Sequence, residues 1–326
     1  MEKLMEEVKE SRGIRDTSVA LYKRHLNKLA MEITGKEYEN QKFLKTKADD
    51  VIKYIKSMSN SVMRNYSASI MVALSPKQKN SPSDDYRNVY ELYAKLLTEG
   101  QANYLESKKD NKMNKKEEKN WMDFEEVVSL RNKIFKRLKQ EGVKLSSKDI
   151  SKSNFDLLQQ YVVLSLYSLI PPRRNEYATM KIINKKDYLE LDKEDLKKNN
   201  YLVNLSKINK MFSYGSDKVK SKIEGGHNTI TVPKELNTVL NLWMHFNKSD
   251  DLLVTQQGGM GMTKNQLTLL LNKIFKPKMI STSMLRKIYL THTFGDEADR
   301  NAKKEKIAED MNHSKKTAED IYIKDV

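Results

Sequence analysis

Apolar side chains recur every three or four positions along the first third of the chain. Residues at that spacing share one face of a helix, so the pattern predicts helices that each bury a single face. The first predicted helix opens at a candidate N-cap, Asp16-Thr17-Ser18, and closes at Gly35. The apolar positions of this helix and of the next three are Val19, Tyr22, Leu26, Leu29 and Ile33; Val51, Ile52, Ile55 and Met58; Val62, Tyr66, Ile70 and Leu74; and Val89, Tyr93, Leu96 and Leu97. The pattern predicts a small helical bundle that ends near Tyr104.

A charged segment follows this bundle. Residues 106–120 read ESKKDNKMNKKEEKN and contain almost no apolar side chain. Such a segment cannot bury a core, so we expect a linker between two domains. The second domain opens at Trp121, where Asp123 is placed to cap a helix through Val127, Val128 and Leu130.

The pattern changes in the second half of the chain. A long apolar helix from Phe155 must stop at Pro171-Pro172, because proline lacks an amide hydrogen and restricts the residue before it. Short apolar runs then predict strands, with a Gly225-Gly226 turn before the last one. The expected strands are Met180–Ile183, Tyr201–Leu205 and Thr229–Val232, and helices are expected again at 236–246, 264–275, 283–294 and 303–311. The predicted fold is mainly α with a small β-sheet or hairpin, in two domains, 1–105 and 121–326, joined by the linker 106–120.

Net charge narrows the choice of partner. The chain has 326 residues, with 60 Lys and Arg against 44 Asp and Glu, which gives a net charge of +16. An excess of this size favours a polyanion, with DNA or RNA first and an acidic membrane surface second. Solubility alone is the other interpretation, since much of the lysine stands in solvated runs.

Residue usage excludes several kinds of chemistry. The absence of cysteine excludes disulfides, thiol catalysis and cysteine-ligated zinc. The five histidines show no H-E-x-x-H spacing, so we expect no metal, and nothing indicates another cofactor. The charged N-terminal segment does not resemble a signal peptide, and the longest apolar stretch, 161–170, is too short to span a bilayer. We therefore expect an intracellular protein that does not enter a membrane.

Two arginine-bearing groups are suited to binding a phosphate. Arg173 and Arg174 stand where the long helix ends, and Glu176 follows them. A guanidinium is permanently charged and binds phosphate oxygens through two parallel hydrogen bonds, and an Arg-x-x-Glu spacing lets the glutamate hold the arginine. Ser283 and Arg286 stand three positions apart and share a face of a later predicted helix.

A third group lies near the end of the chain, where Tyr322 follows His313 by nine positions. Tyrosine, with a pKa of about 10, becomes a good nucleophile only where cations and hydrogen-bond donors stabilise the phenolate and the phosphate it attacks. Each of the three groups by itself is also typical of a charged helix end or of packing. Together, their order and spacing favour chemistry on a phosphate.

In chain order, Arg-x-x-Glu after a long helix, a lysine-rich hairpin, Ser-x-x-Arg, Asn-His-Ser and a tyrosine nine residues after the histidine resemble the tyrosine recombinase, or phage integrase-like, family. The resemblance covers the whole chain. It implies that residues 1–105 form a core-binding domain that clamps DNA. It also implies that residues 121–326 form a mixed α/β catalytic domain.

The resemblance assigns roles to the matching positions. Arg173 and Arg286 match the two family arginines, and Glu176 matches the usual acidic companion of the first. His313 matches the histidine that contacts the phosphate, and Tyr322 matches the nucleophile.

Three roles stay open within the resemblance. The family lysine that protonates the leaving oxygen is expected in the segment 216–222, where Lys218 is the first choice and Lys220 the alternative. Arg174 competes with Arg173 for the role of first arginine, although we expect it to face solvent or the DNA backbone. Ser283 stands where many members have a histidine that accepts the proton of the tyrosine, so the proton acceptor is not assigned.

The resemblance implies a site-specific DNA recombinase or integrase, independent of metal and ATP, that works through a 3′-phosphotyrosyl intermediate. Its partner would be double-stranded DNA, bound by a homo-tetramer on two sites. A mobile element or a virus would encode it, and it would act where the target DNA resides, which in a eukaryotic cell is the nucleus or a viral factory. The alternatives are relaxation of DNA in the manner of a type IB topoisomerase and a non-catalytic DNA-binding protein.

Overall fold

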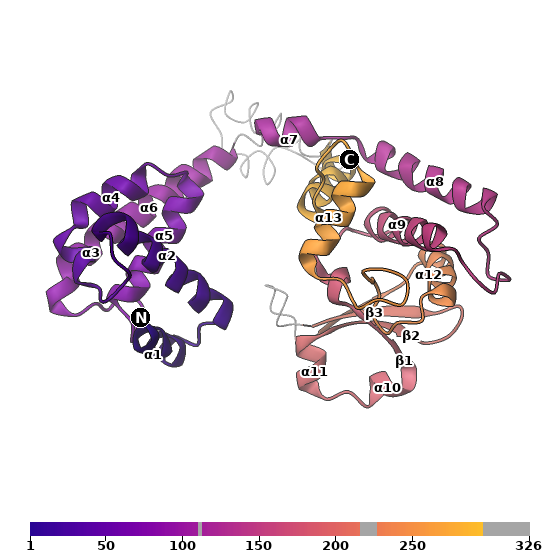
Figure 1. Cartoon of the computed structure of the whole chain (residues 1–326), viewed down its shortest axis with the longest axis horizontal. Coiled ribbons are helices and arrows are strands. Elements are labelled where there is room, and N and C mark those ends of the chain that lie inside the picture. The colour runs from indigo at the N-terminus through magenta and orange to yellow at the C-terminus, as the bar shows by residue number, and fades with distance from the viewer. Residues whose placement is uncertain (110–112, 216–226, 296–326) are drawn as a thin grey trace, which may run out of the picture. The chain divides into compact units, whose positions relative to one another are not determined.

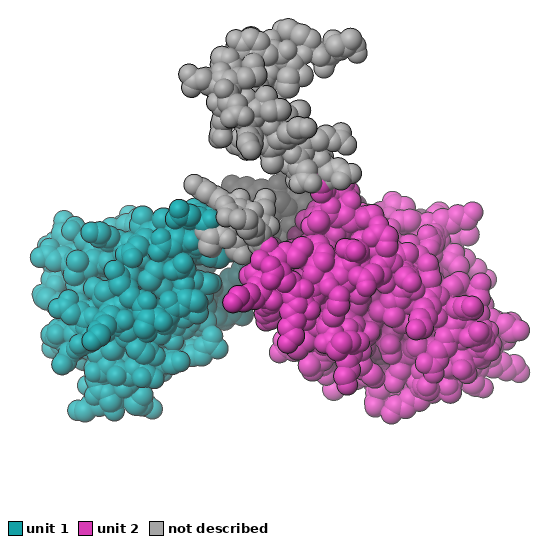
Figure 2. Space-filling view, turned by 90° about the horizontal axis from the view of Figure 1, so that it is seen from above, with its two compact units in different colours: residues 1–112 teal, residues 113–326 magenta. Residues whose placement is uncertain are grey.

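The computed structural model describes residues 1–109, 113–215 and 227–295. These residues form a mainly helical protein with a small four-stranded sheet, which confirms the predicted mainly α architecture with a small β-sheet (Figure 1). The chain divides into two compact units, Met1–Lys112 and Met113–Val326, which Figure 2 colours separately. The boundary falls inside the segment that the sequence predicts to be a linker.

Unit 1 is helical throughout its regular elements. They are α1 (Glu2–Arg12), α2 (Asp16–Thr34), α3 (Lys42–Thr46), α4 (Ala48–Lys56), α5 (Asn60–Leu74), the 3-10 turn η1 (Asp84–Tyr86) and α6 (Arg87–Lys109). Its core contains most of the apolar residues predicted from the spacing, with Leu26, Val51, Ile70 and Tyr93 among the most buried side chains, whereas Val62 is exposed. All four predicted helices are therefore confirmed.

Two details of unit 1 differ from the sequence prediction. The segment before Gly13 forms α1, although it carries few apolar residues, because Met5 and Val8 are placed to be fully buried. Helix α2 begins at Asp16 with Arg15 as its N-cap, so Asp16 lies in the first turn. At its other end α2 stops as predicted, since Gly35 adopts a left-handed conformation with φ 71°.

Much of the expected linker is helical where the structure describes it. Helix α6 runs on to Lys109, and residues 115–120 form α7 (Lys115–Asn120). A capping box starts α7: the Asn114 side chain accepts from the Glu117 amide, and the Glu117 carboxylate accepts from the Asn114 amide. Caps of this kind stabilise a short polar helix that an apolar pattern cannot predict.

Unit 2 combines helices with the sheet. Its named elements are α8 (Phe124–Gln140), α9 (Lys152–Ser168), the 3-10 turn η2 (Glu176–Thr179), β1 (Lys181–Asn184), α10 (Lys185–Leu189), α11 (Lys193–Lys198), β2 (Asn200–Asn204), β3 (Lys210–Gly215), β4 (His227–Thr231), α12 (Lys234–Phe246) and α13 (Lys264–Ile274), and residues 282–295 are helical. The apolar helix α9 packs against α8 and α12 and ends just before Pro171, as predicted.

The four strands pair in chain order, β1-β2-β3-β4. Strands β1 and β2 are parallel, whereas β3 is antiparallel to both of its neighbours. The sequence predicts three of these strands and misses β3. That strand begins with Lys210, whose side chain is nevertheless buried, because its ammonium donates to the side-chain oxygens of Asn237 and Asn241 on α12.

Candidate active site

The segment after α9 carries the first arginine and is held against the core by backbone contacts. The Tyr167 hydroxyl, on α9, donates a 2.6 Å hydrogen bond to the Arg174 carbonyl oxygen. Residues 173–175 are not helical, and η2 begins only at Glu176. Arg174 is exposed, as the sequence analysis expects, while Arg173 is half-buried.

The Arg173 side chain lies on an aromatic ring. Its guanidinium carbon is 3.9 Å from the centroid of the Tyr214 ring, on β3. The sequence analysis expects Glu176 to hold Arg173, but the described contacts contain no ion pair between them. A helix brings side chains three positions apart onto one face, but the backbone from 173 to 175 has no helical turn.

Three buried tyrosines lie near this arginine segment. Burial raises the pKa of Tyr214 to about 12, although the positive charge of Arg173 opposes that rise. Burial also raises the pKa values of Tyr167 and Tyr177 well above their ordinary range, so all three hydroxyls are protonated at neutral pH. These core tyrosines are therefore unsuited to act as the nucleophile.

Several oxygens near Arg173 lack a hydrogen-bond partner of good geometry among the described residues. They are the Glu176 Oε2 atom and the hydroxyls of Tyr177 and Tyr214. A buried polar atom left in this way costs about 1–3 kcal/mol. Each such group calls for an explanation, and a functional role or a water molecule is one of them.

A side-chain hydrogen bond joins the first arginine segment to the second. The Thr282 hydroxyl donates to the Asn175 side-chain oxygen at 2.9 Å, across 107 positions of sequence. Arg286 stands four positions after Thr282, one turn further along the same helix. The structure therefore brings together the two segments that the sequence analysis selects for Arg173 and Arg286.

The helix of residues 282–295 begins with its own cap. The Ser281 hydroxyl accepts a 3.3 Å hydrogen bond from the Met284 amide, and the Ser281 carbonyl accepts from the Leu285 amide. Ser283 follows inside the first turn and is exposed. Arg286 is half-buried, so part of its side chain is accessible.

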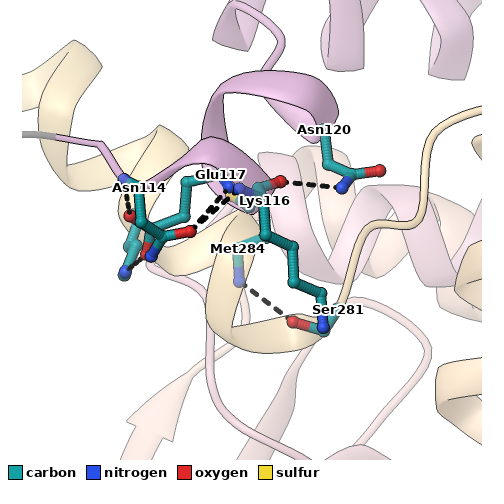
Figure 3. Close-up of polar contacts among 7 residues, drawn as sticks. Asn114, Lys116, Glu117, Asn120, Ser281 and Met284 are labelled. Carbon is teal, nitrogen blue, oxygen red and sulfur yellow. Dashed lines mark hydrogen bonds and ion pairs between the residues drawn. The ribbon is translucent and has the colours of Figure 1, made fainter.

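Helix α7 braces this second arginine segment (Figure 3). The Asn120 side-chain oxygen accepts a 2.6 Å hydrogen bond from the Met279 amide, and Lys278 donates to the Trp121 carbonyl oxygen. Glu117, which caps α7, also forms an ion pair with Lys287, the residue directly after Arg286. Lys287 therefore has a structural partner on α7.

Four predicted site residues lie outside the described residues: Lys218, Lys220, His313 and Tyr322. In the sequence, the two lysines follow Gly215, the last residue of β3, by three and five positions, and Tyr214, whose ring contacts Arg173, directly precedes Gly215.

Sequence reasoning misses three residues of this neighbourhood. Asn175 and Thr282 lie inside selected motifs, but nothing in their identity predicts that they pair. Tyr214 belongs to the strand that the pattern does not reveal. The nearest available signal is the alternation of Phe212 and Tyr214, which stand on one face of β3.

Within the described residues, no group of three or more His, Asp or Glu side chains is arranged to hold a metal ion. In the same part of the chain, no helix combines the length and apolarity that crossing a bilayer requires. Comparison with known proteins found no match among protein-family models, curated proteins or solved structures.

Proposed function

We propose that this chain is a site-specific DNA strand transferase of the tyrosine recombinase type. One observation carries the proposal: the hydrogen bond from Thr282 to Asn175, which joins the Arg173 segment to the start of the Arg286 helix. Two arginines carried by the segments that this bond joins would suit a phosphate diester, because a guanidinium binds anionic oxygens through several N–H donors. The net charge of +16 favours the same polyanion.

In this proposal, Arg173, Arg286 and His313 bind the non-bridging oxygens of the scissile phosphate and stabilise the charge that develops there. The phenolic oxygen of Tyr322 attacks phosphorus and forms a 3′-phosphotyrosyl ester as the bond to the 5′ oxygen breaks. Lys218, or Lys220 in its place, gives a proton to the departing 5′ oxygen.

The energy of the broken bond is retained in the phosphotyrosyl ester. A 5′ hydroxyl can therefore reverse the step on the same strand or on another one, without a nucleotide or a metal. Ser283 does not serve as the base at neutral pH, since an ordinary hydroxyl is not ionised there. The proton of Tyr322 leaves to solvent or to a group not assigned here, in a pocket whose cations favour the phenolate.

Double-stranded DNA is the proposed substrate, bound mainly through phosphate contacts. Recombination between two sites would need a homo-tetramer, and the protein would act in the compartment that holds its target DNA. A mobile element or a virus is the proposed source.

The test is trapping of the covalent intermediate. Nicked duplexes with a randomised centre would be incubated with the chain, and protein–DNA adducts would be resolved on a denaturing gel. We expect an adduct that is absent in Tyr322→Phe and strongly reduced in Arg173→Ala and Arg286→Ala. Arg174→Ala decides between the two neighbouring arginines: it removes the exposed one and should leave adduct formation nearly unchanged if Arg173 is the first arginine.

Other outcomes separate the alternatives. Relaxation of a supercoiled plasmid without any recombinant product would favour the topoisomerase-like function. Salt-sensitive DNA binding without an adduct, and with Tyr322→Phe equal to the unmutated protein, would favour a non-catalytic DNA-binding protein.

A further inference from the structure

The Arg173 guanidinium lies over the Tyr214 ring, with 3.9 Å between the guanidinium carbon and the ring centroid. The plane of a guanidinium can stack on an aromatic ring, while its N–H donors point outward in that plane. In the described part of the chain, Arg173 contacts the ring and the hydroxyl of Tyr214, and no acidic side chain there forms an ion pair with it. The donors needed for an anion are therefore not occupied by a carboxylate.

The ring beneath Arg173 is fixed. Tyr214 is 1% exposed, lies next to the end of β3 and pairs in register with Asn200 on β2 and Asn228 on β4. Its ring also packs near Phe212, with 5.9 Å between the ring centroids. A side chain held on both sides by strands and from below by the core has little freedom to move.

A buried asparagine ties this strand end to the arginine segment. Asn200 is fully buried, and its side-chain oxygen accepts a 3.1 Å hydrogen bond from the Gly215 amide. Its side-chain nitrogen donates to the Glu176 carbonyl oxygen at 3.4 Å. One side chain therefore connects the residue after Tyr214 with the turn that follows Arg173.

The close approach at this point requires glycine. A Cβ at Gly215 would lie 2.3 Å from the Lys197 carbonyl oxygen and 2.8 Å from that of Asn199. Backbone atoms cannot move aside as a flexible side chain would, so a larger residue would displace the end of β3. The contact between β3 and the segment around Asn199 thus depends on Gly215 and Asn200.

We propose that Tyr214 is a positioning residue for Arg173: its ring orients the guanidinium with the N–H edges free for a phosphate, and Asn200 fixes the distance between ring and arginine segment. This inference rests on the proposed function. Preorganised donors stabilise a transition state without reorganising at the moment of reaction. We call the Tyr214 ring beneath Arg173 the platform. Without it, an arginine on an irregular turn would have to lose side-chain freedom when the phosphate binds.

Three variants test the platform. Tyr214→Phe keeps the ring and removes only the hydroxyl, whereas Tyr214→Leu removes the ring. Phe212→Leu is the matched control, because it makes a similar loss in the core two positions earlier on the same strand. Adduct formation would be measured at saturating DNA, and DNA affinity would be measured separately.

We expect Tyr214→Leu to slow adduct formation roughly tenfold at nearly unchanged DNA affinity, which is the size of a strong cation–π contact. Tyr214→Phe and Phe212→Leu should each stay within about twofold of the unmutated rate. In an Arg173→Ala background, Tyr214→Leu should cause no further loss, since a positioning residue acts only through the group it positions. Equal losses with and without Arg173, or equal losses in the Phe and Leu variants, would overturn the inference.

A spectroscopic measurement separates this inference from the proposed function. Protons of a side chain stacked on a ring face resonate upfield, so the Arg173 side-chain signals should be shifted in the unmutated protein and in Tyr214→Phe. They should move to ordinary positions in Tyr214→Leu. Absence of the shift in the unmutated protein would refute the platform. A retained shift in a chain that forms no adduct would instead refute the proposed function and, with it, the catalytic purpose of the platform.

Discussion

Removing the Thr282 hydroxyl tests the contact on which the proposed function depends. Thr282→Val keeps the size of the side chain and deletes its donor, whereas Thr282→Ser keeps the donor and deletes a methyl group. Thr282 is 4% exposed, and its hydroxyl donates to Asn175 at 2.9 Å. The two variants therefore separate the hydrogen bond from the packing.

The expected loss is about 1 kcal/mol. A typical intramolecular hydrogen bond contributes about 0.5–1.5 kcal/mol, and a fully buried acceptor without a donor costs more. Asn175 is only half-buried, so water can reach its side chain in the variant and the cost should stay near the middle of that range. For a unit of this size, 1 kcal/mol lowers the melting temperature by roughly 2–4 °C.

Tryptophan fluorescence during urea unfolding is the suitable assay. The chain has two tryptophans, Trp121 and Trp243, and both belong to unit 2. The signal therefore follows the unit that contains the contact and is insensitive to unit 1. Thr282→Val should unfold at lower urea than Thr282→Ser, with an unchanged slope.

The same pair of variants should differ in adduct formation. Small displacements of a catalytic group slow a reaction strongly, and a shift on the order of 1 Å can cost about a hundredfold. Thr282→Val should thus form adduct at least several times more slowly than Thr282→Ser. The reasoning is refuted if the valine variant is as stable and as active as the serine variant, because the hydrogen bond would then join nothing of consequence.

Three further predictions follow from other contacts. Asn120→Ala removes the side-chain oxygen that accepts the 2.6 Å hydrogen bond from the Met279 amide, and it should destabilise unit 2 by about 1–2 kcal/mol in the same urea assay. Asn114→Ala removes the N-cap of α7 and should cost about 1 kcal/mol. No loss of stability in Asn120→Ala would mean that α7 does not brace the Arg286 segment. Burial, together with the charges of Arg24 and Lys28, lowers the pKa of His25. The unfolded chain therefore binds a proton more readily, and stability is lost as pH falls below about 6.5. Thermal unfolding of unit 1, followed by circular dichroism from pH 7.5 to 5, should show this decline, and His25→Gln should reduce it unless other groups are responsible. Arg173→Ala should lower the dependence of DNA affinity on salt by the equivalent of about one phosphate contact. The measurement is the slope of log K against the logarithm of the salt concentration. A slope equal to that of the unmutated protein would place Arg173 away from the DNA.

The elements that the sequence predicts correctly share a strong local signal. Helices α2, α4, α5 and α6 each repeat apolar residues on one face over several turns, and their burial follows that repeat. Helix α9 is apolar and is stopped by Pro171-Pro172, a signal that depends on proline chemistry alone. Such elements can be predicted because the residues that determine them are neighbours in the sequence.

The elements that it misses depend on residues far away in the chain. Strand β3 contains Lys210, a residue type that is usually exposed. It is buried here because Asn237 and Asn241, 27 and 31 positions later in the chain, accept hydrogen bonds from its ammonium group. Burial lowers the pKa of this lysine, and the two side chains that accept hydrogen bonds from it are neutral. No local pattern can show that a lysine will be solvated by two asparagines from another helix.

The candidate site shows the same division. The sequence analysis identifies the segments of Arg173 and Arg286 as candidates. It also predicts that Arg173 contacts Glu176, because that carboxylate is only three positions away. The structure places Arg173 on Tyr214 instead, 41 positions away by the numbering, since the turn after α9 directs it toward β3. Motifs identify which residues are unusual, whereas the tertiary structure decides what each of them contacts.

Local structure alone does not fix either arginine segment, although Ser281 caps the helix that carries Arg286. Arg173 stands on a turn without helical hydrogen bonds, and Arg286 lies in the second turn of a helix that follows a loop. Their positions depend on side chains from other elements: Tyr214 and Asn200 for the first, Asn120 and Glu117 for the second, and Asn175 with Thr282 between them. Fixing irregular backbone costs about 1–2 kcal/mol of entropy per residue, so each of these contacts offsets a cost that a plain surface loop would avoid. A loop and a helix end that served only to connect elements would not need this many side-chain contacts to other elements. Their concentration around two arginines is most simply explained if the spacing of those arginines matters to what the protein binds.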